Sequence, residues 1–361
     1  MCEVFGTGLN IRINVLQTYS GSLPLSLAQK LHSFANEDAA FTAKELSELQ
    51  RDFALFHVDS IQSTLDKWDL KSAKVDLISV HGQTVYHAPP YSWQLFAPSP
   101  LSLAFNVPVV CDLRAADLAA YGQGAPLTPL ADYILFRDKN GVETRAILNL
   151  GGFCNITLLA PSASATLDQA AKSISGFDVC ACSQLLDAVA RLRLEMPYDR
   201  EGLCAKAGTR DLSIVKELVL KLKGQAQAKR SLGTSDFPAQ WIQHYSDIKP
   251  NDLAASAVSA VATVIIEALP DGTDSIFLAG GGRKNTALCE TLTSLAAARG
   301  MRLTTLDGDQ TKADIYADYR EAISWAILGA LSMDKIPITL TKSTGVEKPP
   351  VAGLWAMPPF P

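Results

Sequence analysis

Hydrophobic and polar positions follow two different periods along the chain, and together they predict an α/β protein. Apolar residues recur at helical spacing in residues 44–65, 184–194 and 211–222. The β-branched runs at 75–80 and 107–111 have instead the length and composition of buried strands. Strands that alternate with amphipathic helices are typical of the α/β class and not of all-α or all-β proteins.

The middle of the chain predicts a β-hairpin. Residues 146–150 and 154–159 are strand-like runs, and Gly151-Gly152-Phe153 between them predicts a tight turn. Further along, the pattern predicts a strand at 275–279, a helix at 285–298, a strand at 302–306 and a helix at 318–331. The tail, residues 347–361, is too rich in proline for regular structure, and we expect Leu354 and Trp355 to anchor it on the surface.

One apolar segment, within residues 252–269, raises the question of a membrane span. The run LAASAVSAVATVIIEAL is shorter than the roughly 20 apolar residues that a spanning helix needs. It is also rich in Ala and Ser and contains Glu267. We therefore expect a helix buried in a globular protein, with small residues at a close contact.

Composition narrows the class further. At about 150 residues per domain, 361 residues predict about two domains. The formal net charge of −5 and the absence of a basic run argue against a nucleic-acid surface. The seven cysteines have no regular spacing and the first residues, MCEVFGTGLN, have no signal-peptide pattern, so we expect reduced thiols and a cytoplasmic protein with no membrane partner.

Glycines at strand ends are the first chemical signal. Consecutive glycines let backbone N–H groups approach a phosphate closely, because no Cβ intervenes. Segments 149–152, 121–126 and 279–285 have this form, and the last opens a predicted helix whose N-terminus favours anions. None is a Walker A loop or a dinucleotide fingerprint. Each alone is better explained by a structural turn than by a ligand site, but three at strand ends in one α/β chain favour phosphate binding more than one does.

A few side chains could carry chemistry. Asp178 precedes a predicted helix, where a helix cap is the alternative role. Glu321 opens the last predicted helix, where position alone favours a solvated first-turn acid. His81 follows a predicted strand, where a lone histidine is usually structural, but the Gly-Gln-Thr after it supplies hydrogen-bonding groups to the end of that strand. Cys180 and Cys182 form a C-x-C pair, but no further ligands complete a zinc site, so we expect no metal there.

Taken in order, these segments resemble the anhydro-N-acetylmuramic acid kinase family, which includes fungal levoglucosan kinases. Residues 79–87 (SVHGQTVYH) look like its HGQTVxH segment, and 148–155 (LNLGGFCN) resembles its NxGGxxN hairpin. Residues 111–127 (CDLRAADLAAYGQGAPL) are similar to its DFRxxDxAxGGQGAPL block. Pro197-Tyr198-Asp199, the glycine run at 279–285 and Arg320-Glu321-Ala322 match too, and the resemblance covers roughly residues 15–357.

The resemblance implies the two-lobed actin-like ATPase-domain fold of sugar kinases, hsp70 and actin. We expect one lobe from residues 1–126 plus 340–361 and the other from 127–339. It also implies a cleft that closes on ATP with Mg²⁺ and on a small anhydrosugar. Such an enzyme would open the 1,6-anhydro ring with water while phosphorylating O6, and a homodimer is compatible with the resemblance.

Roles carry over to this chain by position. Asp178 would be the general base that activates the water, and Glu321 would contact the sugar near its anhydro bridge. The residues implied on the sugar side are His81, Gln83, Arg114 and Asp117. The second phosphate hairpin would contain Gly151, Gly152 and Asn155, and the adenosine site Gly280, Gly281, Gly282 and Asn285.

Two departures from the family pattern leave an alternative open. The family begins with a strand and a GxxSGTSxDGxD hairpin, whereas Gly6-Thr7-Gly8-Leu9-Asn10 lacks its Ser and Asp residues, so we expect that strand and hairpin to be missing. The family's G-[YF]-D-TGPGN loop here is 176–183 (GFDVCACS), which keeps Asp178 but not the following glycines. The alternative is a catalytically impaired sugar- or nucleotide-binding relative, or a truncated gene product.

Overall fold

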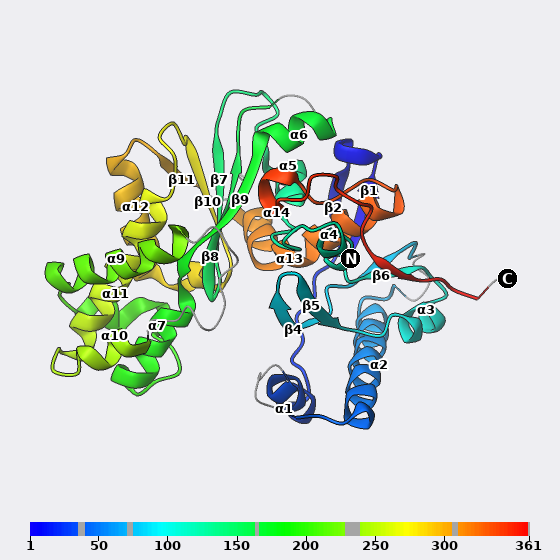
Figure 1. The fold of residues 1–361 in the computed structure, drawn as a ribbon, viewed down its shortest axis with the longest axis horizontal. Helices are drawn as coiled ribbons and strands as arrows, with labels where there is room; N and C mark the ends of the chain where they lie inside the picture. Colours follow the sequence, from blue (N-terminus) through cyan, green and yellow to red (C-terminus); the bar gives the residue numbers. More distant parts are fainter. Residues whose placement is uncertain (35–39, 71–74, 163–165, 228–238, 305–309, 360–361) are drawn as a thin grey trace. The chain divides into compact units, whose positions relative to one another are not determined.

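The computed structural model describes residues 1–34, 40–70, 75–162, 166–227, 239–304 and 310–359 (Figure 1). The chain divides into two compact units. Unit 1 comprises Met1–Leu135 and Glu321–Pro361, and unit 2 comprises Phe136–Arg320. The sequence-based boundaries were 126 and 340.

Unit 1 contains a three-stranded sheet with β6 (Val109–Cys111) at its centre. β3 (Ile78–Ser79) is parallel to β6, and β12 (Leu354–Ala356) is antiparallel to it. All three residues of β6 are buried, as the β-branched run predicted. The expectation that the proline-rich tail has no regular structure is wrong for β12, which is an edge strand of this sheet.

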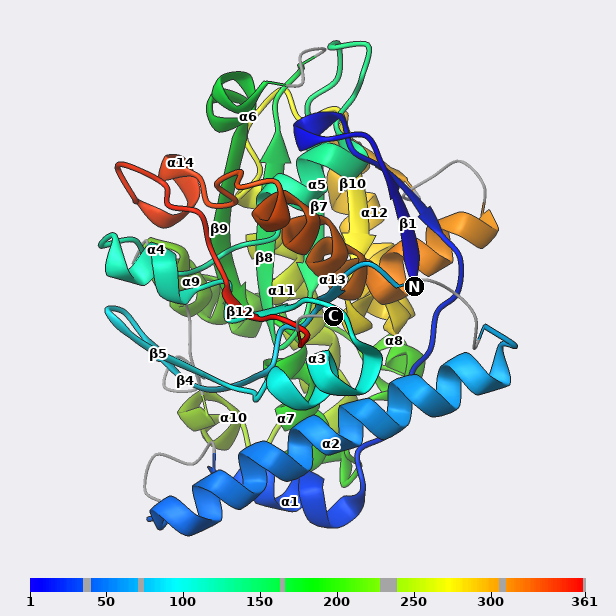
Figure 2. The ribbon, with the colours of Figure 1, turned by 90° about the vertical axis from the view of Figure 1, so that its right-hand side faces the viewer.

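The helices of unit 1 pack around a core that involves β5 (Tyr91–Leu95) and β6. The longest, α2 (Ala43–Lys67), begins at a capping box in which Glu45 N donates to Thr42 Oγ1. It runs beside α3 (Ser99–Phe105) (Figure 2). The other elements of this unit are α1 (Leu25–Phe34), β4 (Gln83–Ala88), α4 (Ala115–Ala119), α5 (Pro129–Phe136, whose last residue lies in unit 2), α14 (Thr341–Thr344) and the later part of α13 (Gln310–Met333).

A short hairpin stands at the N-terminus. β1 (Cys2–Phe5) pairs antiparallel with β2 (Arg12–Val15), and a 3₁₀ turn at Gly8–Asn10 lies between them. Gly6 and Gly8 both have positive φ, which suits the turn. The expectation that a first strand and hairpin are missing is therefore wrong for the backbone, although the motif's Ser and Asp side chains remain absent.

Unit 2 is built on a five-stranded sheet in the order β11-β10-β7-β8-β9. β7 (Arg145–Leu150), β8 (Phe153–Leu159) and β9 (Ile174–Ala181) form an antiparallel meander, which confirms the predicted hairpin. β10 (Ser275–Ala279) is parallel to β7, and β11 (Arg302–Thr304) is parallel to β10. Residues 305 and 306 of the predicted last strand lie outside the described residues.

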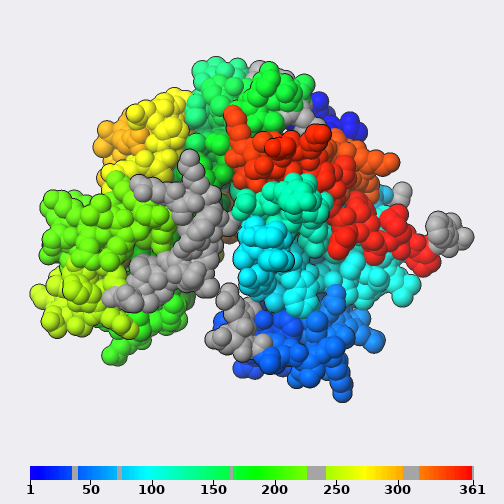
Figure 3. Space-filling model, in the orientation of Figure 1, coloured from blue at the N-terminus to red at the C-terminus, as the bar shows by residue number. Residues whose placement is uncertain are grey.

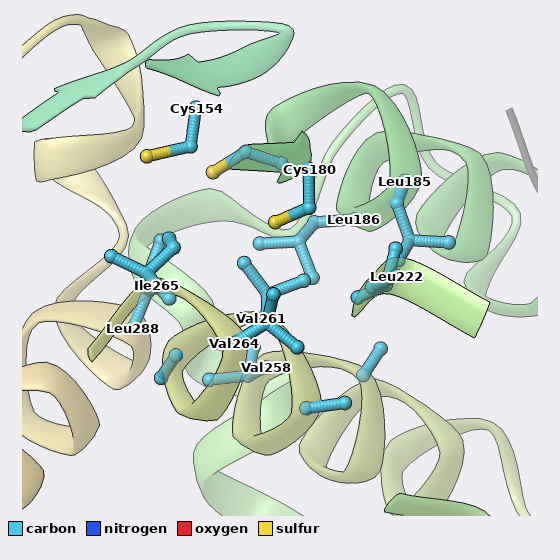
Figure 4. Close-up of a cluster of buried hydrophobic side chains, with 14 of the residues drawn as sticks. Cys154, Cys180, Leu185, Leu186, Leu222, Val258, Val261, Val264, Ile265 and Leu288 are labelled. Carbon is cyan, nitrogen blue, oxygen red and sulfur yellow. The ribbon is translucent and has the colours of Figure 1, made fainter. Parts of the chain in front are cut away.

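One face of this sheet is covered by α11 (Pro250–Glu267), which is the buried apolar helix that the sequence predicted. Val258, Val261 and Ile265 of α11 contact strand residues such as Cys154 and Cys180 in one core (Figure 4). None of the helices in the described ranges combines the length and apolar character that a membrane span requires. The further helices are α6 (Leu167–Ser173), α7 (Ser183–Val189), a π-helical turn (Ala190–Leu194), a 3₁₀ turn (Arg200–Gly202), α8 (Leu203–Ala207), α9 (Leu212–Gln227), α10 (Ala239–His244), a 3₁₀ turn (Gly281–Lys284) and α12 (Thr286–Ala298).

Candidate active site

Three polar residues form a row across the sheet of unit 2. Asn149 of β7 lies opposite Asn155 of β8, and Asn155 lies opposite Asp178 of β9. Residues directly opposite one another in antiparallel strands point to the same face. All three are half-buried, and their face is opposite to the one on which Leu148, Leu150 and Cys154 pack against α11. The sheet therefore presents one carboxylate and two amides together.

A β-bulge makes this row possible. Cys154 pairs with Cys180 while Asn155 pairs with Asp178, so Val179 is an extra residue in β9. Without that bulge, Asp178 and Cys180 would share one face of the strand. Residues 174–181 are thus a strand and not the loop that the family pattern suggested. Val179, Cys180 and Cys182 are fully buried in the core, and Figure 4 shows Cys180 beside Cys154.

The turn Gly151-Gly152 lies at the end of the β7–β8 hairpin beside this row. Its carbonyls accept hydrogen bonds from the residues that open α7: Cys182 N to Gly152 O at 2.8 Å and Ser183 N to Gly151 O at 3.0 Å. A Cβ added to Gly152 would meet only Gln184 Cβ, at 4.0 Å. The outer side of the turn is therefore open to a ligand.

The second glycine run follows β10. Gly280 has φ +83°, and a Cβ there would lie 2.8 Å from Leu150 O. A Cβ on Gly282 would lie 2.8 Å from both Leu150 Cβ and Leu150 O, so this run packs directly against the end of β7. A Cβ on Gly281 would meet nothing within 4 Å. Asn285 caps α12 by accepting a hydrogen bond from Leu288 N at 3.0 Å, so its side-chain oxygen has a structural partner.

In unit 1 the predicted sugar-side residues are centred on Arg114. Its Nη2 donates to His81 Nε2 at 3.3 Å, and its Nη1 donates to Gly124 O at 2.8 Å. Because a guanidinium only donates, His81 Nε2 must accept, and the ring proton belongs on Nδ1, 2.8 Å from Gly82 O. Burial, and then Arg114, lower the pKa of His81, which keeps the ring neutral.

Glu321 and Trp325 lie one turn apart on α13. The Trp325 ring meets the His81 ring edge-on, with centroids 4.6 Å apart. Glu321 is exposed. Burial lowers the pKa of Arg114 as it does that of His81, and the charge of Glu321 partly opposes both shifts. The buried Nε1 of Trp325 and Nε of Arg114 have no hydrogen-bond partner among the described residues. The structure thus brings His81, Arg114 and Glu321 together and adds Trp325, which sequence reasoning missed because it is one of many apolar residues in that helix.

Asp117 has a supporting position. It is 0% exposed. Its Oδ2 accepts from Gly124 N at 2.7 Å, and its Oδ1 accepts from Thr344 Oγ1 at 2.8 Å. The α14 region, red, accordingly lies against the turquoise loop after α4 (Figure 3). The carboxylate therefore fixes the loop that carries Gly124.

Gln83 opens the β4–β5 hairpin, and its Nε2 donates to Thr84 O at 3.1 Å. The same hairpin contains His87, which the sequence analysis did not single out although it ends the HGQTVxH segment. His87 Nδ1 lies 3.0 Å from Ser92 Oγ. Burial, and then the charge of Arg114, lower the pKa of His87, which indicates that this ring lies near the same guanidinium.

The comparison with protein families gives a match over most of the chain. The family model for anhydro-N-acetylmuramic acid kinase matches residues 9–357, nearly the whole chain. The chain belongs to the anhydro-N-acetylmuramic acid kinase family. It is therefore an anhydrosugar kinase by family and a carbohydrate kinase by class, with a small-molecule acceptor and a nucleotide phosphoryl donor. Family membership and the two α/β units place it in the predicted actin-like ATPase-domain fold class.

Solved structures show a more distant likeness. The (R)-2-hydroxyglutaryl-CoA dehydratase component A of Acidaminococcus fermentans is 16% identical, with a TM-score of 0.35 over 58% of this chain and 68% of that one. The activator of the 2-hydroxyisocaproyl-CoA dehydratase of Clostridium difficile, with bound ADPNP, is 17% identical, with a TM-score of 0.33 over 56% of this chain and 64% of that one. Similarity at this level does not define an activity for the kinase.

The donor set of unit 2 suits a nucleotide with Mg²⁺. Among the described residues no three His, Cys, Asp or Glu side chains are grouped as a ready-made metal site. Mg²⁺ in kinases needs no such group, because it is held by one or two carboxylates together with the phosphates. The row of Asp178, Asn155 and Asn149 supplies the oxygen ligands that the ion prefers, and Gly152 and Gly281 leave backbone open beside it.

Proposed function

We propose that the protein is an ATP-dependent kinase of 1,6-anhydrosugars, of the anhydro-N-acetylmuramic acid or levoglucosan type, that opens the anhydro ring with water and phosphorylates O6. The observation that carries this proposal is the row of Asn149, Asn155 and Asp178 on one face of the sheet, beside the Gly151-Gly152 turn. A carboxylate next to two amides and an open glycine turn combines a proton acceptor with a phosphate-binding backbone.

The reaction assigns a simple task to Asp178. Water attacks C1 of the sugar, and Asp178 accepts its proton. The bond between C1 and the bridging oxygen breaks, and that oxygen, now O6, attacks the γ-phosphorus while ADP leaves. Asn155, directly opposite Asp178, is placed to orient the carboxylate. Mg²⁺, when bound with the nucleotide, would neutralise charge on the phosphates.

The residues of unit 1 supply the chemistry for holding the sugar. Arg114 offers guanidinium donors, His81 is held neutral with a fixed tautomer, and exposed Glu321 offers a hydrogen-bond acceptor. Gln83 adds an amide. We assign Asp117 a supporting role, since both of its carboxylate oxygens already have partners. It holds Gly124, whose carbonyl accepts a hydrogen bond from Arg114.

A coupled ADP-release assay with levoglucosan and 1,6-anhydro-N-acetylmuramic acid tests the proposal. Asp178→Asn keeps the shape of the side chain but removes the base, so turnover should fall by about 10²–10⁴. Sugar binding, measured by calorimetry, should persist. Asp168→Asn, at an exposed ion pair with Lys172, is the matched control and should retain activity. An Asp178→Asn variant as active as the wild type would refute the assignment.

A catalytically impaired, sugar- or nucleotide-binding relative is the second candidate. It is favoured by the residues after Asp178, where Val179, Cys180 and Cys182 are packed in the core instead of forming an open glycine loop. Loss of one phosphate donor costs on the order of 10²–10³ in rate. Sugar binding without ADP release from the wild type would support this candidate over the kinase.

A further inference from the structure

Tyr121 combines two features that are costly for a tyrosine. Its φ is +65°, in the left-handed region, and its side chain is 92% exposed. Bulky residues rarely adopt this backbone, and only short polar side chains such as Asn or Asp offset it by local hydrogen bonds. An exposed aromatic ring also gains nothing from packing in the free protein.

The backbone around Tyr121 explains its φ but not its side chain. Tyr121 N donates to Leu118 O at 3.0 Å and Gly122 N donates to Asp117 O at 2.8 Å, which together form a Schellman motif at the end of α4. The left-handed residue of this motif is usually glycine. Here the motif has a large aromatic residue, and its exposed ring gains little packing from the described residues to offset that cost.

The loop that carries Tyr121 is held rigidly from three sides. Gln123 N donates to Thr344 O at 2.8 Å, Gly124 N donates to Asp117 Oδ2 at 2.7 Å, and Arg114 Nη1 donates to Gly124 O at 2.8 Å. Gly122 and Gly124 are buried, whereas Tyr121 and Gln123 are exposed. The loop therefore displays one aromatic ring and one amide on a fixed backbone.

We infer that Tyr121 is a sugar-binding residue whose ring stacks on the apolar face of the anhydropyranose, with the Gln123 amide beside it for the hydroxyl groups. The inference rests on the proposed function, because the loop is bonded to Arg114, which also contacts His81. A pyranose has a C–H face and a hydroxyl rim, and tyrosine offers a rigid amphipathic surface with only two side-chain torsions to fix. Strain that the free protein does not offset is typical of ligand-binding positions.

The test uses Tyr121→Gly, Tyr121→Asn and Tyr121→Phe. Glycine and asparagine tolerate the backbone but lack the ring. We expect Tyr121→Gly to raise Tm by about 1–3 °C and both variants to weaken the binding of levoglucosan or 1,6-anhydro-N-acetylmuramic acid about fivefold to tenfold by calorimetry. KM should rise in parallel with little change in kcat. Tyr121→Phe should bind like the wild type.

Lys335→Gly is the matched control, since Lys335 is also exposed and left-handed in unit 1, with φ +58°. It should change Tm in the same direction as Tyr121→Gly and leave sugar affinity unchanged. Unchanged sugar affinity in Tyr121→Gly, or a lower Tm in that variant, overturns the inference, as does a wild type that binds neither sugar. A wild type that binds a sugar without turnover overturns the kinase proposal alone, because the binding measurement still tests Tyr121.

Discussion

Cys180 lies directly opposite Cys154 in the β8–β9 pair, although Asp178, two residues earlier, lies opposite Asn155 on the other face. The extra residue Val179 makes the two pairings compatible. As a result, Asp178 of β9 belongs to the polar row on one face of the sheet, and Cys180 belongs to the apolar core on the other face. The chemistry of the C-x-C pair follows from this placement: the thiols are core side chains.

Thiol reactivity tests this placement. Burial raises the pKa of Cys111 to about 11 and of Cys182 to about 12, and it raises the pKa of Cys154 and Cys180 well above the usual value. Because the thiolate is the reactive form, these four buried thiols should resist a disulfide reagent at pH 8. Burial also raises the pKa of the remaining three, Cys2, Cys204 and Cys289. These three are partly exposed, however, so the reagent can reach them and they should react first.

All seven thiols should react after unfolding in guanidinium chloride. Cys180→Ala should lower the number of slow thiols by one and leave the fast ones unchanged. Rapid modification of more than three thiols in the native protein would contradict the buried placement of this cluster.

Gly281 and Gly282 offer a matched pair of substitutions in the second glycine run. Gly282→Ala would place a Cβ 2.8 Å from Leu150 Cβ, so we expect overpacking that costs about 1–3 kcal/mol and lowers Tm by about 2–4 °C per kcal/mol. Gly281→Ala meets nothing within 4 Å and should leave Tm within about 1 °C. A methyl group in that open space should instead raise the KM for ATP severalfold, by preventing close approach of the nucleotide.

Thermal melting and steady-state kinetics on both variants check this contrast. Equal Tm values for the two variants would show that the run does not pack on β7 as described. An unchanged KM for ATP in Gly281→Ala would remove this run from the nucleotide site.

Much of unit 2 could be predicted from the sequence because its signals are local. The β7–β8 hairpin follows from two alternating runs around Gly151-Gly152, and α11 follows from a long apolar run with small residues. Glycine turns and helical periodicity are local sequence signals that do not depend on residues far along the chain. The glycine run after β10 is visible in the sequence in the same way, but its packing is a long-range contact, in which Leu150 excludes a Cβ at Gly280 and Gly282.

The features that were missed depend on partners far along the chain. β12 has only three residues in a proline-rich tail, and it becomes a strand because β6 offers it an unpaired edge. The bulge at Val179 has no glycine or proline to mark it, since the register of β9 is set by β8. The role of Asp117 depends on Thr344, which lies 227 residues away. Register and tertiary hydrogen bonds of this kind are not encoded in a local window.

Asp117→Asn separates a supporting role from direct sugar binding. The amide replaces one acceptor oxygen with a donor that faces Gly124 N or Thr344 Oγ1 in a buried place, so we expect a loss of about 1–3 kcal/mol in the free energy of unfolding. Thr344→Val removes only one of the two hydrogen bonds and should cost less, about 1 kcal/mol. Denaturant unfolding gives both values. Below the melting transition, sugar affinity should change less than threefold; a large loss of affinity with normal stability would show that Asp117 contacts the sugar itself.

The pH dependence of stability tests the neutral state of His81. Burial, followed by Arg114, lowers its pKa from the ordinary 6.5, and the opposing charges of Glu321 and Asp112 do not restore it. The unfolded chain therefore takes up a proton near pH 6.5 that the folded protein does not, so this contribution to stability is present above pH 6.5 and is lost as the pH falls toward the folded-state value.

Melting curves of the wild type should accordingly show a lower Tm at pH 5.5 than at pH 7.5. His81→Gln keeps an acceptor for Arg114 but cannot titrate, so its Tm should fall by a few degrees less over the same interval. The exposed His32→Gln is the control and should follow the wild type. An equal fall in Tm for His81→Gln and the wild type would contradict the neutral state of the buried imidazole. The hydrogen bond from Arg114 to His81 Nε2 would then no longer be supported as a fixed contact.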